Sequence, residues 1–193
     1  MSSFILFLGM LAFSDSGYTP IADVHGVKVY KRDSGKGIDL AGEGMIDAPP
    51  EQVRKVLLDY EAHPKWNKNL AESKVLHKDA DALDVYQRLD LPVLSDRDYT
   101  LHVKWGHDGD TLWLRFAADN DRGPAPKKGV VRLSDDEGEW TLQPKDGGAH
   151  TWARYHFRMN LGGSVPGWMG KGSASKEVPT LFDHVREQLK YYR

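Results

Sequence analysis

Asp59 and His63 are the two side chains whose spacing could support acid–base chemistry, because they lie four residues apart in a predicted helical region. That spacing is about one helical turn, so the carboxylate and the imidazole would share a face, as a general acid and base require. The pair also falls at the end of the helix, where solvated polar residues are common, and this second interpretation is the stronger one. His156 shares the expected outer face of its strand with Arg154, which argues against a catalytic role.

Other common chemistries have no signature in this chain. The sequence contains no HExxH metal motif, no GxSxG nucleophile elbow and no glycine-rich phosphate loop. It has no cysteine, which excludes disulfides, thiolate ligands and a cysteine nucleophile. Lys and Arg number 26 against 28 Asp and Glu, so the net charge of -2 gives no footprint for nucleic acid. We expect no catalytic residue, no metal, no cofactor and no nucleic-acid partner.

Two polar side chains are better candidates for binding a ligand. Gln87 is the polar member of a strand face that it shares with Val85 and Leu89. A buried amide needs hydrogen-bond partners, which a ligand headgroup, a trapped water or the neighbouring backbone would supply. Arg97 could hold an anionic headgroup at the rim of a pocket. The alternative for Arg97 is a structural ion pair with a nearby carboxylate.

Strands must position these residues, and the sequence predicts many of them. Short runs that alternate apolar and polar residues, or are rich in β-branched and aromatic residues, indicate strands. They lie at 27–32, 40–46, 72–76, 83–89, 99–105, 111–117, 130–133, 139–143 and 151–161. Turn residues such as those at 107–110 and 146–148 separate most of them. Successive strands with short turns favour an antiparallel meander.

Two helices complete the predicted fold. Pro49 and Pro50 suit the first turn of a helix whose apolar stripe ends at Tyr60. A longer amphipathic helix spans 175–193, and such a helix needs a surface to cover. We therefore expect an α+β fold in which a curved antiparallel sheet grips the C-terminal helix. A chain of 193 residues is enough for one such domain.

Six short motifs occur in the order found in one known family. They are Val24–Arg32, Asp47–Val53, Pro64–Asn67, Ser95–Tyr99, Lys127–Arg132 and Gly162–Trp168. In this order they resemble the motifs of the START family, the steroidogenic-acute-regulatory-related lipid-transfer domains. The resemblance spans about residues 18–190. It implies the helix-grip (Bet v 1-like) fold of a bacterial-type single-domain member, with an internal cavity for a hydrophobic ligand.

Strand parity gives the side chains expected to face that cavity. Trp105 also lies on the inward face of its strand. Each of these apolar positions would equally be explained by packing in the core without a ligand. The expected ligand-binding residues are Val85, Gln87, Leu89, Arg97, Tyr99, Leu101, Val103, Leu112, Leu114, Phe116, Val131, Tyr155, Phe157, Met159, Leu181, Phe182 and Val185.

The resemblance also bears on the ligand and its entry. Some sterol-binding relatives carry an internal acid and an internal arginine where this chain has Gln87 and Val103, which leaves a fatty-acyl, isoprenoid or phospholipid ligand open as well as a sterol-like one. Residues 119–128 correspond to the family's gating loop, so Lys127 and Lys128 could make a transient membrane contact. Pro179 interrupts the C-terminal helix, which makes it a candidate hinge.

Several alternatives remain at this stage. The protein would bind a lipid or other hydrophobic small molecule for transport or sensing, as a monomer. It could instead be a polyketide cyclase/aromatase-like enzyme or a ligand-free interaction domain. The chain divides into an apolar segment, 1–17, and a START-like domain, 18–193. Met1–Ser14 is either a cleaved signal, although no basic residue precedes its apolar run, or a segment that packs on the domain, so the compartment is cytoplasmic or exported.

Overall fold

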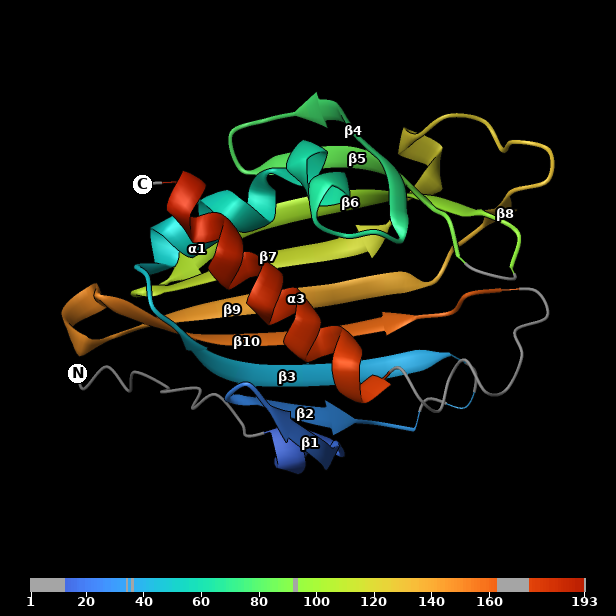
Figure 1. Cartoon of the computed structure of the whole chain (residues 1–193). Coiled ribbons are helices and arrows are strands. Elements are labelled where there is room, and N and C mark those ends of the chain that lie inside the picture. Colours follow the sequence, from blue (N-terminus) through green and yellow to red (C-terminus); the bar gives the residue numbers. More distant parts are fainter. Residues whose placement is uncertain (1–12, 34, 36, 92–93, 163–173, 193) are drawn as a thin grey trace, which may run out of the picture.

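A computed structural model describes residues 13–33, 35, 37–91, 94–162 and 174–192. In this part of the chain a large sheet curves around one long helix (Figure 1). The strands are β1 (Thr19–Val24), β2 (Val27–Lys31), β3 (Ile38–Ile46), β4 (Leu70–Lys78), β5 (Ala82–Leu89), β6 (Arg97–Asp108), β7 (Thr111–Ala118), β8 (Val131–Arg132), β9 (Asp136–Lys145) and β10 (His150–Met159). The helices are α1 (Pro50–Leu58) and α3 (Ala174–Gln188), with short 3-10 turns η1 (Phe13–Ser16), η2 (Tyr60–Lys65), η3 (Asn120–Arg122), η4 (Asp146–Gly148) and η5 (Leu189–Tyr191).

The sheet has the strand order β1-β2-β3-β10-β9-β7-β6-β5-β4, and every neighbouring pair on this path is antiparallel. Pairing of β3 with β10, the last strand in the sequence, joins the three N-terminal strands to the rest of the curved sheet. The long helix α3 runs diagonally across the concave side, from β3 toward α1 (Figure 1). This is the predicted α+β helix-grip arrangement, and the prediction is confirmed.

Two details differ from the predicted meander. The short strand β8 runs parallel to β6, with Val131 opposite Arg97. This pairing arises because β6 is longer than β7, which reaches only Leu101, and β8 fills the free edge. Strand β1 was not predicted, because its side chains are mostly exposed and its sequence lacks a clear alternation.

Two of the three clusters of buried side chains lie on the concave face. The first joins α1 and α3 to β2, β3, β7, β9 and β10, and Phe182 of α3 is fully buried within it. The second lies under η2, β4, β5 and β6 and includes Val85, Leu101 and Val103. Helix α3 therefore covers one half of the concave face more closely than the other.

Close approach of α3 to the sheet depends on a glycine in β3. A Cβ atom on Gly42 would overlap the side chain of Val178 in α3. Glycine at this position thus provides the clearance that the helix needs.

On the opposite face of the sheet, η1 is attached through Phe13. This side chain is 8% exposed, and its ring centre lies 5.4 Å from each of the rings of Tyr18 and Tyr30. The guanidinium of Arg154 lies 4.1 Å from the centre of the Phe13 ring. Residues 1–12, and residues 163–168 of the predicted turn at Gly162–Trp168, lie outside the described residues. None of the described helices is long and apolar enough to cross a bilayer.

Candidate ligand-binding cavity

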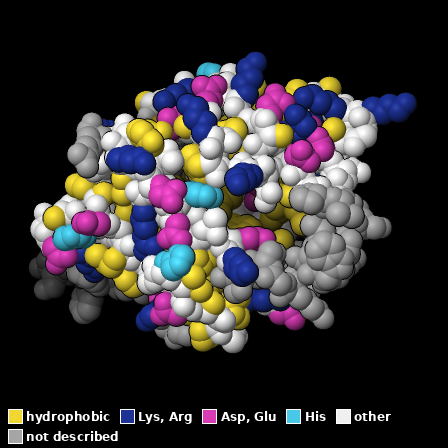
Figure 2. All heavy atoms as spheres, viewed as in Figure 1, with side chains coloured by type: hydrophobic (Ala, Val, Ile, Leu, Met, Phe, Trp, Pro, Cys, Tyr) yellow, Lys and Arg dark blue, Asp and Glu magenta, His cyan; other side chains and the backbone are white. Residues whose placement is uncertain are grey.

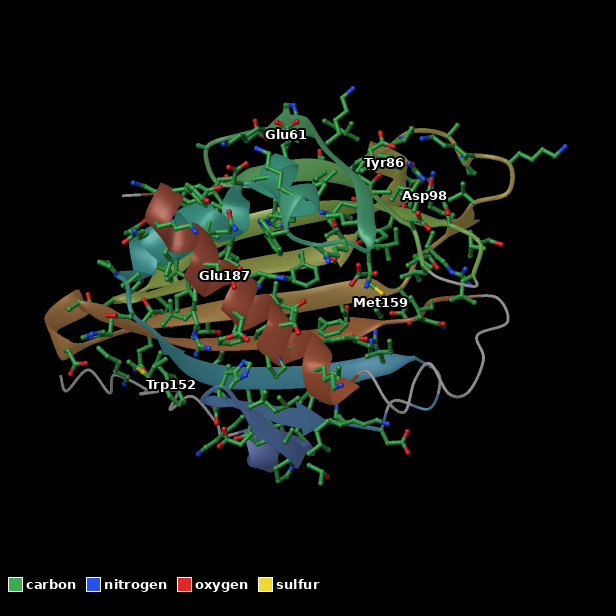
Figure 3. The ribbon with its side chains drawn as sticks, viewed as in Figure 1. Glu61, Tyr86, Asp98, Trp152, Met159 and Glu187 are labelled. Carbon is green, nitrogen blue, oxygen red and sulfur yellow. The ribbon has the colours of Figure 1, made fainter. Side chains whose placement is uncertain are left out.

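A cavity of about 790 Å³ opens beside α3, between the helix and the end of β10. Its lining residues are Ile38, Trp66, Asn67, Asn69, Leu89, Leu91, Tyr155, Phe157, Met159, Leu161, Lys176, Glu177, Val178, Thr180, Leu181 and His184. Figure 2 shows a recess on this face with hydrophobic side chains at its bottom and charged side chains around it. Figure 3 places Met159 at the end of β10, close to α3.

The cavity lies at the junction of the two core clusters. Tyr155, Phe157 and Leu181 pack on the first cluster, and Met159 and Leu161 pack on the second. Since α3 crosses the sheet diagonally, it seals the first cluster and leaves a gap over the edge of the second. The geometry of the crossing, rather than a special residue, creates the space.

Five of the residues predicted from strand and helix parity line this cavity: Leu89, Tyr155, Phe157, Met159 and Leu181. The others lie on the expected face but in the packed clusters beside it. Val85, Tyr99, Leu101 and Val103 are buried in the second cluster, with Phe116 and Val131 against it, and Leu112, Leu114, Phe182 and Val185 are buried in the first. Ligand contact by these residues stays a prediction.

Gln87 is held by two side chains rather than by backbone. The hydroxyl of Tyr99 donates to Gln87 Oε1 at 3.0 Å, and Gln87 Nε2 donates to Ser73 Oγ at 3.0 Å. The amide is therefore satisfied at both ends without a ligand headgroup.

Arg97 is 2% exposed and contacts Leu161, one of the residues that line the cavity. Its guanidinium donates to the carbonyl oxygen of Leu161 at 3.2 Å and to that of Ser95. The ion pair expected for Arg97 belongs instead to its neighbour Asp98, which accepts from Arg132 at 2.7 Å on the other face of the strand. Figure 3 shows Asp98 beside Tyr86, whose hydroxyl donates to the same carboxylate.

Asp59 and His63 do not form an acid–base pair. Asp59 accepts a hydrogen bond of 2.5 Å from the hydroxyl of Tyr192. His63 is packed between the rings of Tyr60 and Trp66, at 4.7 and 4.6 Å between centres. Burial lowers the pKa of His63 to about 4, so the imidazole is neutral at pH 7. The pair lies at the end of the helical region as expected, but His63 is packed between rings there rather than solvated.

Asp136 is the inward-facing residue that the sequence analysis missed. It begins β9, is 4% exposed, and shares its face with Trp140 and Leu142. Burial, followed by the charges of Asp135 and Glu137, raises its pKa to about 7. Its even spacing from Trp140 in the strand could have indicated that it faces inward. However, Asp136 lies in an acidic run whose sequence is typical of a solvated turn.

Three tyrosines come close enough to Asp136 to respond to its charge. Burial first, and then Asp136, raise the pKa of Tyr60, Tyr99 and Tyr155, so all three keep their protons at neutral pH. They arrive from η2, β6 and β10. The carboxyl group of Asp136 and these three hydroxyl groups are therefore close enough to interact among apolar side chains.

The loop at 119–128, which was predicted to gate the cavity, contacts the sheet through Lys127 and Pro124. The Lys127 ammonium lies 4.8 Å from the centre of the Tyr86 ring and 3.8 Å from a Glu72 carboxylate oxygen. Arg132 donates to the carbonyl oxygen of Pro124 at 3.2 Å. Among the described residues, no group of three or more His, Asp or Glu side chains could hold a metal ion.

Comparison with known proteins agrees with this architecture. Residues 46–186 match a family described as polyketide cyclase / dehydrase and lipid transport. A curated but uncharacterised protein of Pseudomonas aeruginosa is 29% identical over 150 residues, which are 76% of this chain and 74% of that protein.

Two solved structures extend the comparison. The STAR-related lipid transfer protein of Xanthomonas axonopodis superposes with a TM-score of 0.80 at 29% identity, covering 90% of this chain and 99% of that one. Human STARD10 gives 0.79 at 20% identity over 92% and 74% of the two chains, which shows a shared fold. The resemblance to START domains inferred from the motifs is confirmed.

Proposed function

Because the chain belongs to the polyketide cyclase/dehydrase and lipid transport family, we propose that it encloses a hydrophobic ligand beside α3 for transport or sensing. The observation that carries this proposal is the cavity of about 790 Å³ with its mainly apolar lining. That volume lies within the range of roughly 300–1,000 Å³ typical of small-molecule sites. The name of the Xanthomonas relative, a lipid transfer protein, supports a lipid as the ligand.

Enclosure is what such a ligand requires in water. Burial of one methylene contributes about 0.8 kcal/mol, so a chain of about sixteen carbons gains roughly 13 kcal/mol before the costs of binding. The cavity offers apolar walls on two sides: Phe157 and Met159 from the sheet, and Leu181 from α3. Both faces of a ligand chain held between these walls would be removed from contact with water.

The alternative of a packed interaction domain is less well supported. It requires Trp105, Phe116, Tyr155 and Phe157 to fill the grip. Tyr155 and Phe157 instead form one wall of the cavity, with their ring centres 5.5 Å apart. The remaining space exceeds the roughly 300 Å³ that marks the lower end of small-molecule sites.

A cavity-filling variant tests the proposal. We expect Leu181→Trp, which adds bulk at the wall, to reduce binding of the apolar fluorophore Nile red at least tenfold while the protein stays folded. Leu76→Trp is the matched control, because Leu76 is 39% exposed on β4, away from the cavity. Equal binding by the folded Leu181→Trp variant and the wild type would contradict the proposed site.

A polyketide cyclase-like enzyme is the second candidate, because the family description includes such enzymes. The buried carboxyl of Asp136 is the observation that favours it, since a raised pKa is common in general acids and bases. Incubation with a poly-β-keto thioester separates the two candidates. Cyclised product formed faster than without protein, and lost in Asp136→Asn, would favour the enzyme.

A further inference from the structure

The carboxyl group of Asp136 has no partner that explains its burial. The residue is 4% exposed, and its side chain makes no hydrogen bond or ion pair with any described residue. A buried polar group without a partner costs free energy, and native structures keep few of them. A carboxyl group retained in this state needs an explanation beyond packing.

Asp136 lies directly behind the cavity wall. In the sheet it is paired with Met159 of β10, so the two side chains stand side by side on the concave face. Met159 lines the cavity, and so does Tyr155, which responds to the charge of Asp136. Met159 is a flexible side chain, and its movement would connect the cavity to the carboxyl group.

Two hydroxyl groups near Asp136 are also without partners in the described part of the chain. The hydroxyl of Tyr99 is used by Gln87, at 3.0 Å. Those of Tyr60 and Tyr155 make no hydrogen bond with another described residue. One carboxyl and two hydroxyl groups, brought together from β9, η2 and β10, therefore have free hydrogen-bonding capacity inside an apolar interior.

The charges around this group select against an anion. The charged groups that act on Asp136 are the carboxylates of Asp135 and Glu137. Both of these pair with the Arg158 guanidinium, at 3.3 and 3.1 Å, so the carboxyl group of Asp136 is the one of the three left without a cation from the described residues. Arg158 lies on the opposite face of the sheet with Glu137, so a carboxylate or phosphate on a ligand at the concave face would meet the charge of Asp136 and burial. A hydroxyl group, in contrast, donates to the carboxyl oxygen and stays neutral.

We propose that Asp136, with the hydroxyls of Tyr60 and Tyr155, binds the polar end of an amphiphile whose headgroup is a hydroxyl rather than an anion. The inference rests on the proposed function, since it places the apolar part of the same ligand in the cavity beside α3. It assigns the buried carboxyl a role in ligand selection.

The test is displacement of Nile red at pH 8 by three matched probes: 1-hexadecanol, its methyl ether and palmitate. A hydrogen bond to a charged acceptor is worth about 1.5–3 kcal/mol. We therefore expect the alcohol to bind at least tenfold more tightly than the ether, which cannot donate, and more tightly than palmitate. In Asp136→Leu the preference for the alcohol over the ether should fall to about one, while the ether binds as in the wild type.

Two further variants keep the test decisive. Glu137→Leu, on the opposite face of β9, is the matched control and should keep the full preference for the alcohol. Tyr155→Phe removes only a hydroxyl, so it should lose several-fold of that preference even if Asp136→Leu does not fold. Equal binding of alcohol and ether by the wild type, or tighter binding of palmitate, would overturn the inference but leave the cavity in place. Displacement by none of the three probes would overturn the proposed function itself.

Discussion

At the scale of single residues, Asp136 should make the stability of the fold depend on pH. Its ordinary pKa of 3.8 is raised to about 7 in the folded state. The folded state therefore binds the proton more tightly than the unfolded one. The contribution of this proton to the free energy of unfolding is fully present below pH 4 and is lost as the pH rises through 7. The shift corresponds to roughly 4 kcal/mol at alkaline pH.

Asp136→Asn should remove this dependence. The charges that act on Asp136 are those of Asp135 and Glu137, both of which pair with Arg158. The three tyrosines described above keep their protons in this range. We expect urea unfolding to show that the free energy of unfolding of the variant rises relative to that of the wild type between pH 5 and 8. A difference between the two proteins that stays constant across this range would show that the carboxyl group is not buried as described.

At the scale of elements, η1 should belong to the folded domain through Phe13. Loss of this ring in Phe13→Ala removes its contacts with Tyr18, Tyr30 and Arg154. We expect a loss of about 3–5 kcal/mol in the free energy of unfolding, measured with urea. Leu76→Ala, at an exposed position, should change it by no more than about 0.5 kcal/mol. Equal effects of the two substitutions would place η1 outside the cooperative unit.

Helix α3 carries the second prediction at this scale. Pro179 lies inside α3 and cannot donate the backbone hydrogen bond that this position would otherwise make. It is followed by Thr180 and Leu181, which line the cavity. We expect Pro179→Ala to strengthen the helix and to slow Nile red release several-fold in stopped-flow displacement. Faster or unchanged release would show that opening does not involve this part of α3.

The positions of the helices and of the strands other than β1 could be predicted from the sequence, and so could the faces of most of these strands. The alternation of inward and outward side chains in runs such as 99–105 and 111–117 depends on local sequence alone, and β6 and β7 form there. The parallel pairing of β8 could not be predicted, because it depends on the unequal lengths of β6 and β7.

At the scale of the whole molecule, the cavity itself was beyond sequence reasoning. Parity assigns Leu101 and Phe157 equally to the concave face, but only Phe157 lines the cavity. The difference depends on where α3 crosses the sheet, which is set by long-range contacts such as that of Val178 over Gly42. Asp136 was missed for a similar reason, because only its position in the assembled sheet separates it from its exposed acidic neighbours.

At this scale the molecule is a curved sheet with two packed clusters on its concave face and a cavity beside α3 where they meet. Two packed clusters hold the fold, so the cavity at their junction is not required for folding. A ligand bound there would bridge the clusters and stabilise the protein by mass action.

Native mass spectrometry with lipid extraction, on protein purified without detergent, tests this account most directly. We predict one hydrophobic molecule per chain, absent from Leu181→Trp and retained in Leu76→Trp. Wild-type protein that is empty, and that takes up no lipid from added vesicles of mixed long-chain lipids and alcohols, would contradict the account.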